Sequence, residues 1–434
     1  MSALLRPHAT RRWALAAATV LIVAGSQLGM LWLANAYLHI ERDEDVLSLE
    51  ALFGVAAILL VLLSARAGLH PGLPQVLTSD RIGRWLLTFL ALCIVGELLR
   101  PDRTLGHVST FISIGAYYMI GVAVGRWFAS ERASMPVVPM LLAIYTFWYI
   151  GLAAFYMSGD LGFYGELPDS DVLRLEFRSG FTATELPIYV GFQLPVLLYV
   201  LLTPHGPLTR IQAMALLACA TGLIYLSASA AALAALLIVL VVVVVAWRGA
   251  SLANIVRMAA ALALVTASGA ALVSDIVEST GEKIESFVAS EGVRALIYNE
   301  LVNIIQTEPM GIGKSRFVQT NNFSWLGEGV FPHNNVLGIG AEMGVIAMAA
   351  FLVLCALAFV RLGRTALARR QAVPQRVRVL VAVALSVFVY QQFRGLFQDT
   401  WVVKETYFWL GIGASVALAF AGNAQLAQKD RREI

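Results

Sequence analysis

The sequence predicts an all-α fold, a polytopic bundle of transmembrane helices, and three observations predict it. Hydrophobic residues make up 59% of the 434 residues and charged residues only 14%, whereas soluble domains average about 45–50% and about 25%. Long apolar runs recur along the chain, and each is roughly the 17–25 residues that a helix needs to cross a bilayer. Lipid cannot satisfy exposed backbone groups, so helices are the expected spanning structure. A net charge of only +3 argues against nucleic acid as a partner.

Charged breaks divide the chain into about twelve predicted spans within a single integral membrane domain, residues 1–434. The first run lacks a small-residue cleavage site, so it is interpreted as a permanent anchor and not as a signal peptide. Only residues 227–229 separate the seventh and eighth runs, so a tight hairpin or a broken helix fits there. The predicted spans are 13–38, 47–65, 85–99, 110–129, 137–157, 186–202, 212–227, 230–247, 258–274, 335–360, 379–396 and 406–422.

The distribution of basic residues predicts the orientation. Most of the 31 lysines and arginines fall in segments that are cytoplasmic if both chain ends are, including a basic run at 361–378. Positive charge is enriched in cytoplasmic loops of membrane proteins. We therefore expect both termini in the cytoplasm.

Two external segments are long enough to carry a site, residues 158–185 and residues 275–334. Long loops in compact proteins are usually functional or disordered. In the second segment, apolar residues recur at helical spacing within 284–288 and 296–305, which predicts short amphipathic helices. Pro309 and the glycines of 310–313 are expected to end the second one. Such helices lie at the external membrane face or pack over a cavity; the sequence leaves both open.

External cations stand out because the external loops are otherwise acidic. Arg394 lies at the outer end of a span, where an arginine requires water, an anion or a carboxylate; Asp399 and the lipid headgroups are the alternatives to a bound anion. Arg174 and Arg178 lie among acidic residues, so an ion-pair network and ligand binding are both open. Arginine side chains match phosphate oxygens in geometry.

Histidine is scarce, and His333 is the most informative. It follows Pro332, precedes Asn334, and stands where the long loop re-enters the membrane. An imidazole there can exchange a proton near neutral pH, or it can serve only to cap a helix. His107, by contrast, lies in a short loop without neighbouring residues that suggest a reaction. Glu342, inside a predicted span, is expected either to orient a basic side chain or to stabilise the bundle.

The order of four short stretches resembles the O-antigen ligase and polymerase superfamily of bacterial membrane glycosyltransferases. They are an arginine before a helix (294–298), a P-x-G-x-G turn (308–313), an H-N motif entering a span (332–337) and an E-x-G stretch (342–346). Two departures are visible. Ala230 stands where many members carry an arginine, and Ala347 stands where ligases tend to have the second glycine of a G-x-x-G pair.

The resemblance implies an inverting glycosyltransferase on the periplasmic side of the bacterial inner membrane, working without a metal or cofactor. Its donor is a glycan on undecaprenyl diphosphate, and its acceptor is a growing glycan or lipid A core. Arg294 would bind the diphosphate and His333 would be catalytic. Membrane lipids and polysaccharide-assembly proteins are further expected partners. Arg178 and Arg394 are added as diphosphate-binding residues, and the supporting residues are Arg174, Arg316, Lys314, Asn334 and Glu342.

The sequence favours a polymerase that joins repeat units, with a ligase as the alternative within the class. A polysaccharide transporter or flippase is the alternative of another class, because twelve spans with both ends inside is also a transporter plan. Against it, neither a duplicated half nor paired broken helices are evident. A structural scaffold is a third interpretation, and it predicts no dependence on Arg294 or His333.

Overall fold

The computed structural model describes most of the chain, and everything below refers to these described residues. They are 7–39, 49–64, 80–100, 105–130, 137–165, 173–177, 186–227, 230–248, 295–317, 332–368, 373–396, 398 and 400–430.

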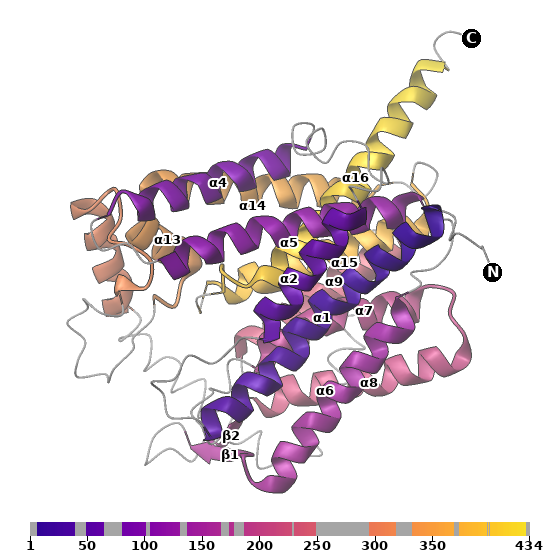
Figure 1. Ribbon diagram of the computed structural model, residues 1–434, viewed down its shortest axis with the longest axis horizontal. Helices are drawn as coiled ribbons and strands as arrows, with labels where there is room; N and C mark the ends of the chain where they lie inside the picture. The colour runs from indigo at the N-terminus through magenta and orange to yellow at the C-terminus, as the bar shows by residue number, and fades with distance from the viewer. Residues whose placement is uncertain are drawn as a thin grey trace.

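Long helices make up nearly all of this structure (Figure 1). Residues 295–307 are also helical. The bounded elements are α1 (Pro7–His39), α2 (Leu49–Ser64), α4 (Arg81–Leu98), α5 (Leu105–Ser130), α6 (Val138–Ser158), β1 (Leu161–Gly165), β2 (Leu173–Phe177), α7 (Leu186–Leu202), α8 (Pro207–Leu226), α9 (Ala230–Arg248), α13 (Asn335–Met343), α14 (Val345–Ala366), α15 (Gln375–Arg394) and α16 (Lys404–Asp430).

The predicted helical membrane protein is confirmed. Six of the described helices are long and apolar enough to cross a membrane, and two shorter apolar helices lie at 186–202 and 234–247. Every predicted span except 258–274 coincides with described helix; that run lies outside the described residues. The total number of spans therefore stays a prediction.

Helix α15 lies at the centre of the bundle and packs against α7, α9, α14 and α16. Small residues allow other helices to approach closely. A Cβ added to Gly121 in α5 would lie 2.0 Å from the carbonyl oxygen of Phe408 in α16, and one added to Gly411 would lie 2.3 Å from that of Tyr118. Membrane helices commonly use such small-residue contacts, because packing replaces the hydrophobic effect between them.

The segment 158–185, which is predicted to be external, contains a short antiparallel hairpin that the all-α prediction did not include. Strands β1 and β2 pair with Leu161 opposite Phe177 and Tyr164 opposite Arg174. Leu161, Leu175 and Phe177 are buried. The hairpin is thus anchored by one apolar face beside the bundle, which itself remains helical.

The predicted single span 335–360 is wrong, because the helix is broken at Gly344. Helix α13 ends at Met343 and α14 begins at Val345, and Gly344 between them has φ of 95°. Such a positive φ strains any residue with a Cβ. A Cβ there would also lie 2.8 Å from the carbonyl group of Met310, so the break accommodates another part of the chain.

Figure 1 shows both chain termini near the same end of the bundle, remote from α13. We refer to the opposite end, where α4 ends and α13 lies, as the α13 end. Its assignment to the periplasm remains a prediction.

Candidate functional site

The predicted P-x-G-x-G turn docks onto the break between α13 and α14. The helix at 295–307 ends just before it, as predicted. The backbone N–H groups of Ile312 and Gly313 donate to the carbonyls of Ala341 and Glu342, both at 2.8 Å, and Val345 N–H donates to the Pro309 carbonyl at 2.9 Å. The bonds satisfy backbone groups that the break would otherwise leave unpaired.

The turn places the Lys314 side chain beside that of Glu342. The Nζ atom of Lys314 lies 3.2 Å from Oε2 of Glu342, and only 1% of the glutamate side chain and 11% of the lysine side chain are exposed. The same Nζ lies 4.9 Å from the centre of the Trp401 ring, within range of a cation–π interaction. A buried carboxylate requires such a partner because leaving water is costly for a charge.

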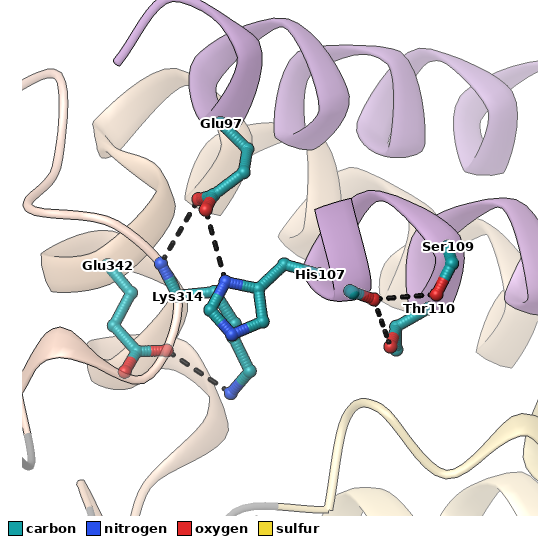
Figure 2. Close-up of polar contacts among 7 residues, drawn as sticks. Glu97, His107, Ser109, Thr110, Lys314 and Glu342 are labelled. Carbon is teal, nitrogen blue, oxygen red and sulfur yellow. Dashed lines mark hydrogen bonds and ion pairs between the residues drawn. The ribbon is translucent and has the colours of Figure 1, made fainter. Parts of the chain in front are cut away.

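A second buried carboxylate, Glu97 in the last turn of α4, lies on the other side of Lys314 (Figure 2). Its Oε2 accepts from the Lys314 backbone N–H at 3.4 Å, and its Oε1 lies 3.1 Å from Nδ1 of His107. The expectation that His107 lacks a chemically relevant neighbour is therefore wrong. Glu97 lies near the end of α4 and His107 near the start of α5, and sequence reasoning missed that two residues so close in the chain could pair.

Two arginines meet at the same turn. Arg100 donates through Nη2 to the carbonyls of Met310, at 3.4 Å, and of Gly311. A Cβ added to Gly313 would lie 3.1 Å from Nη1 of Arg100 and 2.8 Å from Nε of Arg316. The α13 end therefore gathers three fixed cations, Arg100, Lys314 and Arg316, beside two carboxylates.

His333 lies immediately before α13, in a backbone conformation with φ of 51°. The Tyr298 hydroxyl lies 3.3 Å from the His333 carbonyl and 3.1 Å from that of Leu396. Asn334 caps α13, because its Oδ1 accepts from the N–H groups of Val336 and Leu337, both at 3.0 Å. The capping asparagine and Tyr298 together fix the backbone that carries the partly exposed imidazole.

The second asparagine joins α13 to the loop between α15 and α16. Oδ1 of Asn335 accepts from the N–H groups of Thr400, at 2.8 Å, and Trp401, at 3.1 Å. Asn335 N–H donates to the Gly395 carbonyl at 2.6 Å. The Trp401 ring also lies under Lys314, which pairs with Glu342 near the other end of α13. Trp401 therefore connects the two ends of this helix.

Arg394 ends α15 and is 1% exposed. Its Nη2 donates to Oε1 of Gln398. The side chain is therefore turned into the protein and does not reach toward headgroups. Asp399, the predicted carboxylate partner, lies outside the described residues.

Three other predicted residues cannot be placed in the site. Arg294 and Arg178 lie outside the described residues, and of Arg174 only the β2 backbone is described. Within the described ranges, no group of three or more His, Cys, Asp or Glu side chains is arranged to hold a metal ion. The structure brings together Lys314, Arg316 and Glu342, and adds Glu97, Arg100 and His107.

This arrangement suits the binding of an anionic substrate near proton-exchanging groups. Lys314 is held by a buried carboxylate and Arg100 by backbone carbonyls, so these cations are preorganised to stabilise developing negative charge. Arginine offers paired donors to phosphate, and lysine adds a point charge. The imidazoles of His107 and His333 supply side chains of the kind that transfers protons in catalysis.

The O-antigen ligase family matches residues 215–352. The matched segment runs from α8 to the start of α14 and contains Lys314, Arg316, His333 and Glu342. No curated protein matches the chain.

Proposed function

We propose, from the match of residues 215–352 to the O-antigen ligase family, that this multi-pass membrane protein transfers glycan from undecaprenyl diphosphate at the periplasmic face. An acceptor hydroxyl attacks the anomeric carbon of the donor with inversion. The bond from that carbon to the phosphate oxygen breaks, and its electron pair leaves on the lipid diphosphate. No metal ion is required, because the leaving group is already activated and fixed cations stabilise its charge.

The observation that carries this proposal is the position of His333, Lys314 and Arg316. All three lie in the matched segment. Lys314 and Arg316 belong to the turn that docks beside α13, and His333 directly precedes that helix, which lies at the end of the bundle remote from the start of α1 (Figure 1). A lipid-linked diphosphate enters from the bilayer, so it meets cations at the end of a helical bundle more readily than in a water-exposed loop.

Roles follow for the individual residues. Arg294 and Arg178 bind the diphosphate, with Lys314, Arg316 and Arg174 supporting them, and the buried guanidinium of Arg394 adds positive charge from inside the protein. His333 acts at the reaction centre, on the acceptor or on the leaving group. Asn334 fixes the His333 backbone by capping α13, and Glu342 positions Lys314.

We favour polymerisation of O-antigen or exopolysaccharide repeat units. The alternative is a ligase that transfers finished glycan to lipid A core, and the description of the matched family supports it. Deleting the gene distinguishes them. Loss of a polymerase leaves lipid A core with a single repeat, whereas loss of a ligase leaves bare core and carrier-linked polymer.

The enzymatic proposal is tested by complementing that deletion with variants. His333→Ala and Arg294→Ala are each expected to abolish surface glycan while the protein still accumulates in the membrane. Matched controls are His205→Ala and Arg210→Ala, at the turn between α7 and α8, where Arg210 donates to the Thr203 carbonyl at 3.1 Å. The controls are expected to restore glycan. Normal glycan in both site variants would contradict the proposal.

A further inference from the structure

The pair formed by Glu97 and His107 has the geometry of an oriented base. Glu97 comes from the last turn of α4 and His107 from the first turn of α5. Nδ1 of His107 lies 3.1 Å from Oε1 of Glu97, and the exposed fractions are 26% for the histidine side chain and 1% for the glutamate side chain. One partner is thus fixed inside the protein and the other reaches its surface.

The carboxylate determines which imidazole nitrogen carries the proton. An ionised carboxylate only accepts hydrogen bonds, so Nδ1 of His107 donates to it. Nε2, on the other side of the ring (Figure 2), is then the nitrogen that accepts a proton. A carboxylate that orients an imidazole in this way is the arrangement that makes histidine a general base in hydrolases.

Charged groups from three elements meet at the turn that Glu97 contacts beside His107. Glu97 and Arg100 belong to the end of α4, Lys314 and Arg316 to the turn, and Glu342 to α13. Glu97 accepts the hydrogen bond that orients the imidazole, whereas the three cations attract an anionic substrate. A base beside an anion site is what a glycosyl transfer from a lipid diphosphate requires.

His107 and His333 lie at the same end of the bundle. Lys314 bonds to Glu97 through its backbone and lies over Trp401 through its side chain. The backbone N–H of Trp401 in turn donates to Oδ1 of Asn335, which lies two residues after His333. These contacts connect the two residues that carry the imidazoles to the same α13 end of the bundle.

We propose that His107, oriented by Glu97, is the base that accepts the proton of the acceptor hydroxyl. This inference rests on the proposed function. It assigns acceptance of the acceptor's proton to one histidine and stabilisation of the leaving group to the other. As the new bond forms between the acceptor oxygen and the anomeric carbon, the hydroxyl proton passes to Nε2 of His107. The electron pair of the broken bond leaves on the diphosphate, beside His333 and the cations, and His107 then returns its proton to water. Glu97 is a positioning residue in this scheme.

The experiment uses full-length protein in nanodiscs. The substrate is the lipid-linked glycan extracted from membranes of the host that lacks this chain. His107→Ala is expected to lower the transfer rate about 10²–10⁴-fold, the usual contribution of a general base. Added imidazole is expected to restore part of that rate, and the restored rate should rise with the neutral fraction of imidazole. A purely structural histidine would not respond to imidazole in this way.

Two further variants complete the design. Glu97→Gln is expected to reduce the rate while the apparent KM for the glycan stays unchanged, and Glu97→Asp to recover part of it. Ser109→Ala is the matched control, because Ser109 lies in the same turn of α5 and its hydroxyl bonds only locally, to the Gly106 carbonyl at 2.7 Å. It is expected to keep the wild-type rate.

A His107→Ala protein with the wild-type rate, or with a loss that imidazole does not restore, would overturn the assignment of the base and leave the transferase intact. A wild-type protein that transfers no glycan would overturn the transferase itself, and the base with it.

Discussion

Replacing Gly311 with alanine tests the docking of the P-x-G-x-G turn. Gly311 has φ of 79°, and an added Cβ would lie 2.5 Å from both the Glu342 carbonyl oxygen and the Gly344 nitrogen. The left-handed conformation costs an alanine about 1–2 kcal/mol, and overpacking a tight site typically costs about 1–3 kcal/mol. We therefore expect Gly311→Ala to destabilise the protein by roughly 2–5 kcal/mol.

The functional consequence follows from the same geometry. Relief of the clash requires the turn to move away from the helix break, which carries Lys314 away from Glu342. Surface glycan is therefore expected to fall more steeply than the amount of protein in the membrane.

Thermal unfolding of the purified protein, followed by tryptophan fluorescence, measures the stability. Gly222→Ala in α8 is the matched control, because nothing lies within 4 Å of its added Cβ. Alanine favours a helix over glycine by up to about 1 kcal/mol, so the control should be as stable as the wild type or more so. Equal midpoints for the Gly311 and Gly222 variants would refute the docking argument.

The remaining predictions concern the ion pair, the asparagine bridge and metal dependence. Lys314→Met leaves the Glu342 carboxylate buried beside an apolar group and should cost about 3–5 kcal/mol, whereas adding Glu342→Gln should recover part of that loss; equal unfolding midpoints of the single and double variants would contradict the pairing. Asn335→Ala removes the acceptor for two N–H groups, at roughly 1–3 kcal/mol each, so we expect a loss of about 2–6 kcal/mol in the same assay; an unchanged unfolding midpoint would contradict the bridge. Glycan transfer in EDTA should proceed at the untreated rate, and a loss that added Mg²⁺ reverses would contradict a metal-independent mechanism.

Much of the fold could be predicted because the bilayer imposes it. A helix must be long enough to span the hydrocarbon and must be apolar, so composition and run length are sufficient to locate α5 or α15. The break at Gly344 was missed for the same reason. Glycine is common inside membrane helices, and only the docked turn, remote in sequence, makes this one a break.

The site was less predictable, and the difference lies in sequence separation. The pairing of Glu97 with His107 was within reach, because the two residues flank one short loop and face the same side of the membrane. The alternation of residues 173–177 also carried a strand signal. By contrast, Lys314 meets Glu342 only because backbone hydrogen bonds dock the turn on the broken helix, and no local pattern contains that information.

The central claim is that this chain breaks the bond between a glycan and its lipid diphosphate, and direct measurement of the released lipid tests it. Purified wild-type protein should release one undecaprenyl diphosphate for each glycan transferred to an acceptor, while His333→Ala and Arg294→Ala proteins should release almost none. Movement of intact lipid-linked glycan across the vesicle membrane without such release would identify a transporter and contradict the account.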